Sequence, residues 1–142
     1  MVQSFTLDLE RFGKKAIGNA NKIVRKIVFD MHSRIVERTP VDTGRAKANN
    51  QVCLHSIPHT SVMDVDKSGN ATIMKGQTVM SRFNLGDTVF IYNNLEYIIA
   101  LEYGHSRQQA PNGMFRITFE EVFNHLDKGP TPLDVLGVLG LK

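Results

Sequence analysis

Glu102 and His105 are the residues of this 142-residue sequence that come closest to a general acid–base pair. They stand in the stretch LEYGHSRQQAPNGM, residues 101–114, where two glycines and a proline bracket a polar run. Acid–base catalysis also needs a pocket, an orienting partner and a nucleophile or activated water. No Ser or Cys elbow and no second carboxylate at a diagnostic spacing lies nearby. The pattern favours shaped backbone, and we predict that the chain is not an enzyme.

Two other segments resemble parts of metal sites. Cys53, His55 and His59 are close in sequence, but a four-ligand zinc site normally adds a second ligand pair. The run DVDKSGN, residues 64–70, begins like a calcium loop, yet Lys75 holds the twelfth position, where a bidentate Glu belongs. Ser-Gly-Asn is ordinary turn chemistry. We therefore predict a polar hairpin tip there, with no metal site and no cofactor.

A second glycine-containing segment, RTPVDTGRAK, spans residues 38–47. Pro40 keeps the preceding residue out of the helical region, Asp42 and Thr43 can hydrogen-bond neighbouring backbone amides, and Gly44 permits a positive φ. The G-x-x-x-x-G-K-[ST] spacing of a phosphate-binding loop is missing, and no strand precedes the segment. It is predicted to be a sharp turn.

Composition places the chain among ordinary globular domains. It is 42% hydrophobic and 22% charged, and its length suits one domain. No apolar run approaches the roughly 20 residues of a membrane helix, and the first residues lack the pattern of a signal peptide. The one cysteine cannot form an internal disulfide. We expect a protein made in a cytoplasm and without membrane contact.

The formal net charge of +3 comes mainly from the first forty residues. A nucleic-acid footprint would cluster Lys and Arg with stacking aromatic residues, and that cluster is missing. The basic residues of the first helix are therefore expected to form a solvated face. Contact with DNA passing nearby stays open for four of them: Lys14, Lys15, Lys22 and Arg25.

Periodicity predicts the main elements. Apolar residues recur at three- and four-residue steps over 5–38 and again over 114–126, which predicts two amphipathic helices. Residues 49–55 and 87–92 are predicted strands, the second because it is β-branched and aromatic. Residues 57–70 are expected to be loose. Residues 71–83 fit either a short helix or a strand broken at Gly76.

The stretch after the second strand is predicted to form one or two helical turns ending at Gly104. Tyr97 and Tyr103 are expected to fill the gap between the sheet and the long helix. Glu102 is expected to pair with a base or to accept backbone amides, and residues 105–109 to form a surface loop offered to a neighbouring subunit.

These elements define an α+β fold with a long N-terminal helix on a small, mostly antiparallel sheet, followed by a C-terminal helix. We predict one domain over residues 1–128 and an extended arm over 129–142. In the arm, two prolines precede an apolar segment: Leu133, Val135, Leu136, Val138, Leu139 and Leu141. Packing on an adjacent protein and folding back on its own core are both open for this arm.

Two motifs, in order and with these elements around them, resemble the tail-completion and neck proteins of long-tailed bacteriophages, the lambda minor tail protein Z type and putative tail components. The resemblance covers roughly residues 5–127. The first motif is the Thr-Pro-Val-Asp-Thr-Gly turn: Thr39, Pro40, Val41, Asp42, Thr43 and Gly44. The second is Asn-x-x-x-Tyr, Glu-Tyr-Gly and Ala-Pro-x-Gly-Met: Asn93, Tyr97, Glu102, Tyr103, Gly104, Ala110, Pro111, Gly113 and Met114.

The resemblance implies a structural protein of the virion at the head-proximal end of the tail. Such proteins form rings, usually hexameric, that terminate the tail tube or join it to the head–tail connector around the DNA channel. It implies as partners further copies of the chain, the connector and the tail tube proteins. The alternatives are a small hydrolase using Glu102 and His105, and a non-specific DNA-binding module.

Overall fold

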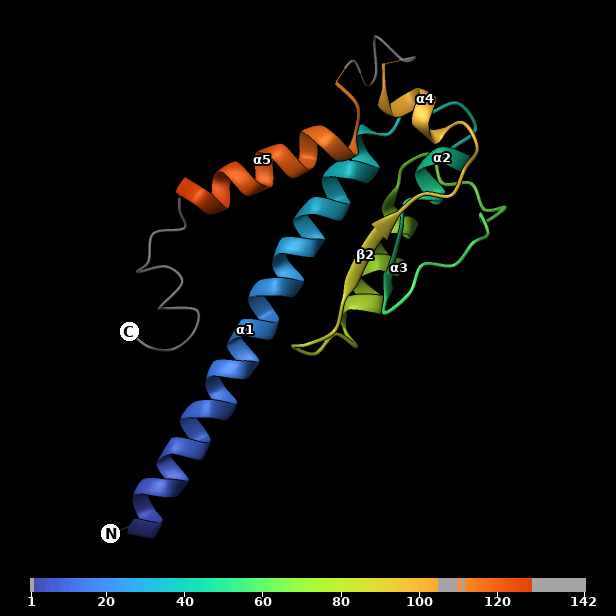
Figure 1. Cartoon of the computed structure of the whole chain (residues 1–142). Helices are drawn as coiled ribbons and strands as arrows, with labels where there is room; N and C mark the ends of the chain where they lie inside the picture. Colours follow the sequence, from blue (N-terminus) through green and yellow to red (C-terminus); the bar gives the residue numbers. More distant parts are fainter. Residues whose placement is uncertain (1, 105–109, 111, 129–142) are drawn as a thin grey trace.

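One long helix supports a small sheet and the remaining helices (Figure 1). The structure is a computed structural model that describes residues 2–104, 110 and 112–128. The predicted α+β class, with its long first helix, small antiparallel sheet and closing helix, is confirmed. In chain order the elements are α1 (Val2–Arg38), α2 (Arg45–Ala48), β1 (Gln51–Leu54), α3 (Asn70–Met80), β2 (Val89–Tyr92), α4 (Ile98–Glu102) and α5 (Phe115–Lys128).

The first helix, α1, is much longer than the body that packs on it. Its 37 residues span about 55 Å at 1.5 Å per residue. Its C-terminal half lies within the body, whereas its N-terminal half extends beyond the other labelled elements (Figure 1). The helix ends where Thr39 donates its hydroxyl to the Ile35 carbonyl at 2.7 Å, one residue before Pro40. The predicted end of this helix is thus confirmed.

The sheet is a single antiparallel pair. Gln51 lies opposite Tyr92 and Leu54 lies opposite Val89. A two-stranded ribbon is at best marginally stable in water, so the pair depends on the helices that cover it. The cover is an apolar cluster that takes residues from α1, β1, α3 and the turn after α3. Its buried members are Val28, Val52, Met80 and Phe83.

A second apolar cluster lies at the C-terminal end of α1. Ile35 and Met114 are fully buried there, together with Ala110. Partly buried residues from β2, α4 and α5 pack against these three: Ile91, Ile98, Leu101 and Phe115. The cluster therefore fixes the short helix α4 and the start of α5 relative to α1.

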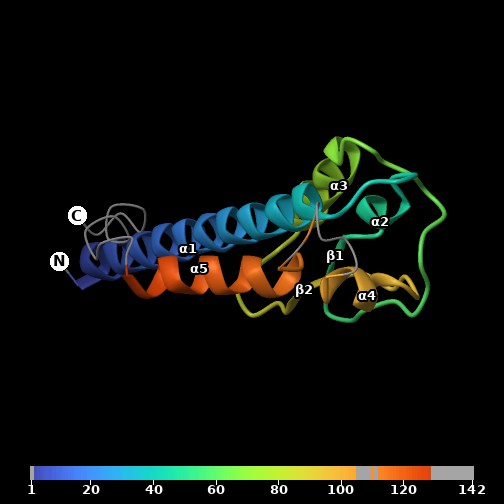
Figure 2. The same cartoon turned by 90° about the horizontal axis from the view of Figure 1, so that it is seen from above.

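The closing helix, α5, is joined to α1 by ion pairs as well as by apolar contacts. Glu121 accepts from Arg34 Nη1 at 2.9 Å and from Arg38 Nη2 at 2.6 and 2.8 Å. Arg38 also donates to the buried hydroxyl of Thr118 at 2.9 Å. In both views α5 and α3 lie on opposite sides of α1 (Figures 1 and 2).

The ends of several elements differ from those predicted. Both strands are shorter than the predicted 49–55 and 87–92. The first begins at Gln51 because Asn49 and Asn50 use their side chains in hydrogen bonds before the ladder begins. The closing helix is displaced by one or two residues from 114–126. Residues 71–83, left between helix and strand, are mostly helix, because Gly76 lies within α3 and does not break it.

Parts of the prediction lie outside the described residues. These are the arm over residues 129–142, the loop over 105–109 with His105, and Pro111. The helix α5 ends at Lys128, and the domain limit predicted there stays a prediction. Among the helices that the structure describes, none combines the length and apolar character needed to cross a membrane.

Gly76 and Gly18 provide a matched test of this packing. A Cβ at Gly76 would lie 2.5 Å from His32 Nδ1 and 3.2 Å from Val52 Cγ2, whereas nothing lies within 4 Å of a Cβ at Gly18. We predict that Gly76→Ala lowers the free energy of unfolding by about 1–3 kcal/mol. Gly18→Ala should instead raise it by up to about 1 kcal/mol, through helix propensity alone. Urea denaturation measures both, and equal effects would contradict this packing.

Candidate functional site

The two motifs that carry the resemblance meet at one buried asparagine. Asn50 Nδ2 donates to Thr39 Oγ1 at 2.7 Å, and Asn50 Oδ1 accepts from Asn93 Nδ2 at 3.0 Å. Asn93 Nδ2 also donates to the Ala46 carbonyl at 3.0 Å. The first motif and the start of the second are therefore tied together through Asn50, which belongs to neither.

His32 of α1 joins the same network. Its Nε2 lies 2.8 Å from the Asn50 carbonyl oxygen. Because a carbonyl only accepts, Nε2 carries the proton and Nδ1 is the unprotonated nitrogen of the neutral ring. Burial lowers the pKa of His32, and the hydrogen bond to Asn50 opposes that shift only partly. The histidine is thus a neutral structural donor.

The turn at residues 39–44 is shaped by Gly44. Its φ is +90°, and a Cβ there would lie 2.7 Å from the backbone of Asp66 and Lys67. The Gly44 carbonyl accepts the N–H groups of Ala48 and Asp66 at 3.1 and 3.0 Å. The glycine therefore begins α2 and lets the following loop pass close to the turn, as the predicted positive φ implied.

The segment 64–70 is a helix cap, so the predicted hairpin tip is wrong. Asp66 accepts the Gly69 N–H at 3.0 Å, the Thr72 N–H at 2.9 Å and the Thr72 hydroxyl at 2.8 Å. Burial acts to raise the pKa of Asp66, but these hydrogen bonds hold it below its ordinary value. Turns and helix caps use the same residue types, so only the helix that follows distinguishes them.

The calcium-like run has an internal partner for its first carboxylate. Lys75 donates to Asp64 at 2.8 Å, so the first and twelfth positions of the calcium-like run form an exposed ion pair. Within the described part of the chain, no group of three His, Cys, Asp or Glu side chains is placed to hold a metal ion.

Glu102 caps the N-terminus of α5. Its Oε2 accepts the N–H groups of Met114 and Phe115 at 2.8 and 3.0 Å, and its Oε1 accepts the N–H of Arg116 at 2.8 Å. The Arg116 side chain donates the fourth hydrogen bond to this carboxylate, from its Nε to Oε1 at 3.2 Å. The first N–H groups of a helix have no partner within the helix, and a carboxylate there is favoured by the helix dipole. The expectation that Glu102 accepts backbone amides is confirmed.

The electrostatics of Glu102 suit this structural role. Burial acts to raise its pKa, but the hydrogen bonds from the Arg116, Met114 and Phe115 amides outweigh burial and lower the pKa. A carboxylate with a lowered pKa is a weak base, and both its oxygens are already occupied. His105, its proposed catalytic partner, lies outside the described residues.

The remaining residues of the second motif let the chain approach Glu102 closely. Gly113 has a φ of +81°, and a Cβ there would lie 2.5 Å from the Glu102 carbonyl oxygen. Gly104, with φ +93°, follows the end of α4 as predicted. Ala110 and Met114 are buried in the second apolar cluster.

The tyrosines do not fill the gap between the sheet and the long helix, so that expectation is wrong. Tyr97 and Tyr103 are 44% and 65% exposed, and Ile99 is 68% exposed. The apolar face of α4 that packs inward is formed by Ile98 and Leu101 instead. We call the exposed set of Tyr97, Ile99 and Tyr103 the α4 surface. Arg116 stacks on Tyr103, with Cζ 4.2 Å from the ring centre.

A groove adjoins the α4 surface. It runs between the turn at residues 40–46 and two residues that follow β2, Tyr97 and Leu101, and has a volume of ≈ 560 Å³. We call it the turn groove. The two motifs thus share a buried network on the inside and a groove on the outside.

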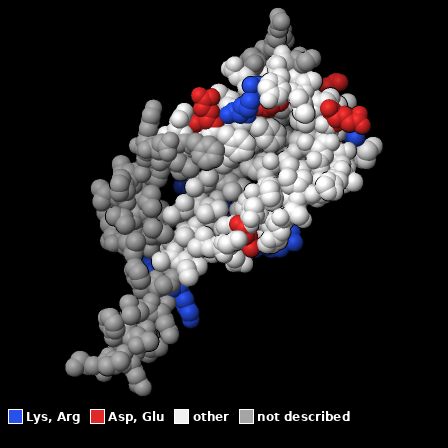
Figure 3. Space-filling view, in the orientation of Figure 1, with Lys and Arg blue, Asp and Glu red and all other residues white. Residues whose placement is uncertain are grey.

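The basic residues of α1 do not form one face. Lys14, Lys15 and Lys22 are exposed, but Arg25 is half-buried and its Nη2 donates to the Phe83 carbonyl at 2.8 Å. Arg25 therefore links α1 to the turn after α3, which corrects its placement among the solvated residues. On the face shown in Figure 3, the described Lys and Arg atoms are scattered among uncharged ones.

Two features of the site did not follow from the sequence. Asn50 was assigned to a strand. The Asn-Asn pair at residues 49 and 50 is unusual at the start of a buried strand, and it was the sequence signal that could have shown a different role. The cluster of Arg34, Arg38 and Glu121 had no local signal, because Glu121 is 87 and 83 residues away from the two arginines.

Comparison of the chain with protein-family models, with curated proteins and with solved structures gives no match.

The cap on α5 yields a test of Glu102. We predict that Glu102→Gln lowers the free energy of unfolding by about 1–3 kcal/mol, since an amide NH2 then faces the N–H donors. A carboxyl group whose pKa is lowered by folding stabilises fully above its ordinary pKa, about 4.5. That stabilisation is lost as the pH falls through the folded-state value. The difference between the two proteins should therefore be constant from pH 8 down to about 4.5 and shrink as the pH falls further.

The control is Glu120→Gln, which removes the same negative charge from an exposed residue of α5. It should have little effect on stability at any pH. Thermal unfolding between pH 3 and 8 measures all three proteins. A pH-independent loss for Glu102→Gln would contradict the capping role of its charge.

Proposed function

We propose that this chain is a structural protein of a bacteriophage virion. It acts at the head-proximal end of the tail, as a tail-completion or neck subunit, and forms a ring around the DNA channel with further copies of itself. The tail tube and the head–tail connector are its neighbours in the particle. The proposal rests on the two motifs and on what their residues do in the fold.

One observation carries the proposal: the motif residues either hold backbone shape or present an apolar surface. Asn93, Thr39 and Glu102 use their polar groups in internal hydrogen bonds. The exposed members, Tyr97 and Tyr103, adjoin Ile99 and the turn groove. Exposed aromatic residues beside a groove are typical of protein–protein contact sites.

The hydrolase alternative has less support from the same residues. Glu102 already accepts four N–H groups and has a lowered pKa, so it is poorly suited to take a proton from a substrate. A residue that caps a helix is also costly to release for chemistry. We propose that the chain is not an enzyme.

A ring with a rotation axis forms by heterologous contacts, in which one face of each subunit meets a different face of the next. The α4 surface and the turn groove provide one such face. In a ring, the exposed lysines of α1 offset phosphate charge on passing DNA without reading its bases. Arg25 takes no part in this contact, because its guanidinium is bonded to the Phe83 carbonyl.

Assembly is tested by one substitution on the α4 surface. We predict that the full chain forms rings, and that Ile99→Glu weakens subunit association by at least about tenfold, since a charge would be buried at the contact. Sedimentation velocity and negative-stain electron microscopy measure the assembly. The matched control is Met74→Glu, because Met74 on α3 is 65% exposed, close to the value for Ile99.

The control variant should assemble like the parent chain. Monomers at every concentration, with Glu102-dependent hydrolysis of a substrate, would contradict the proposed function. Immunogold labelling of purified particles of the source phage should mark the junction of head and tail.

The DNA contact has its own test. Replacing Lys14, Lys15 and Lys22 with Gln should weaken binding of the assembled protein to duplex DNA equally for unrelated sequences. The slope of log affinity against log salt concentration should fall by about 0.9 for each phosphate that the variant no longer neutralises. Fluorescence anisotropy measures both quantities. The control variant replaces Lys67 and Arg82 with Gln, since both residues are exposed and lie outside α1. An unchanged slope in the lysine variant would count against the channel contact.

A further inference from the structure

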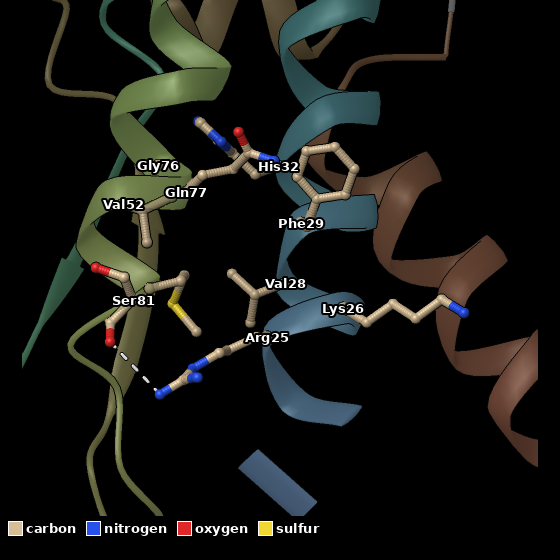
Figure 4. Close-up of a pocket in the computed structure, with 10 residues that line it drawn as sticks. Arg25, Lys26, Val28, Phe29, His32, Val52, Gly76, Gln77 and Ser81 are labelled. Atoms are coloured by element: carbon tan, nitrogen blue, oxygen red, sulfur yellow. Dashed lines mark hydrogen bonds between the residues drawn. The ribbon is translucent and has the colours of Figure 1, made fainter. Parts of the chain in front are cut away.

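A second groove lies between α1 and α3, away from both motifs (Figure 4). We call it the α1–α3 groove, and its volume is ≈ 360 Å³. Apolar side chains from both helices and from β1 line it: Val28, Phe29, Val52 and Met80. Arg25 and Lys26 lie at one end, and Gln77 and Ser81 line the α3 side.

The groove exists because α3 approaches α1 at Gly76. The absence of a side chain there brings the α3 backbone against the His32 ring, and His32 is held in turn by Asn50. Phe29 remains 42% exposed at the mouth of the groove and belongs to neither apolar cluster. Val28, Val52 and Met80 line the groove but are only 4–8% exposed, so Phe29 is the apolar side chain that stays open to solvent at its mouth.

The sequence contains one segment whose chemistry matches this groove. Residues 129–142 read GPTPLDVLGVLGLK, with Pro130 and Pro132 followed by six Leu and Val residues. Their single acidic residue is Asp134, at the start of the apolar part. The apolar part of this segment matches the apolar lining of the groove.

The arrangement of the helices indicates which copy supplies the segment. It follows α5, and α5 lies on the side of α1 opposite to α3 (Figures 1 and 2). The axis of α5 diverges from α1 in Figure 1, so its C-terminal end is directed away from the chain's own groove. Fourteen residues can span about 45 Å when extended, which is enough to reach a neighbouring subunit.

We propose that residues 129–142 of one copy bind in the α1–α3 groove of a second copy, with the leucines and valines against Phe29 and Met80. This inference rests on the proposed function, since it requires copies that associate. It adds a specific contact to the ring: an apolar arm, stiffened at its start by two prolines, that links each subunit to the next.

Cysteine cross-linking between different chains tests the pairing directly. In a Cys53→Ala background, a full chain with Gln77→Cys is mixed with a full chain with Leu136→Cys and oxidised. We expect a disulfide-linked heterodimer on a non-reducing gel. The control replaces Gln77→Cys with Ala71→Cys, which is exposed on α3 but does not line the groove, and it should give at least tenfold less heterodimer.

A binding measurement supports the same assignment without a covalent trap. A fluorescent peptide of residues 129–142 is titrated into the full chain carrying Leu136→Glu, which disables its own arm. Phe29→Glu should weaken peptide binding by at least tenfold. Ile17→Glu, at a position on α1 that is 54% exposed and outside the groove, should leave binding unchanged.

The outcomes separate this inference from the proposed function. Rings that form without preference for the Gln77 and Leu136 cross-link overturn the groove assignment and leave the ring intact. A further chain carries both Gln77→Cys and Leu136→Cys. If its disulfide forms only within one chain and the protein stays monomeric, the groove assignment and the proposed ring are both overturned. Equal peptide affinity for the Phe29→Glu and Ile17→Glu variants also overturns the groove assignment.

Discussion

Asn50 has no exposed surface, and its polar groups bond to four segments of the chain. Its side chain reaches Thr39 and Asn93, its carbonyl oxygen accepts from His32, and its N–H donates to the Lys47 carbonyl. A buried amide left without partners costs more free energy than a single hydrogen bond contributes. The end of α1, the turn after it, α2 and the segment after β2 are therefore held in one arrangement at the start of β1. The turn groove and the α4 surface depend on that arrangement, because their residues follow directly from these segments.

Glu102 plays the corresponding role at the other end of α4. A short helix such as α4 contributes little stability by itself, so its direction must be set by tertiary contacts. The inward residues Ile98 and Leu101 supply the apolar part, and the Glu102 carboxylate supplies the polar part by binding the first amides of α5. Tyr97 and Tyr103 lie on the exposed side of this arrangement. A residue pattern that looks like half of a catalytic pair is thus a cap that orients an exposed aromatic surface.

The sequence predicted the elements better than their contacts. The helices α1 and α5 and both strands follow from periodicity and residue type, and the order of elements and the α+β class were correct. Gly76 left α3 undecided, because a glycine that breaks an element and one that lets a helix approach a neighbour look alike in sequence. Asp66 was assigned to a hairpin because turns and caps share their chemistry. The outward direction of Tyr97 and the Arg25 bond to Phe83 depend on how distant segments meet, so no local pattern contained them.

The length of α1 has a mechanical consequence. The helix extends well beyond the body, and within the body it is held from two sides, by Glu121 on α5 and by the apolar cluster with Met80 of α3. A force applied to the N-terminal half of α1 is therefore resisted both by the ion pairs with Glu121 and by the apolar cluster. Ion pairs weaken with salt while apolar contacts do not, so the stiffness of this anchorage changes with the ionic strength around it.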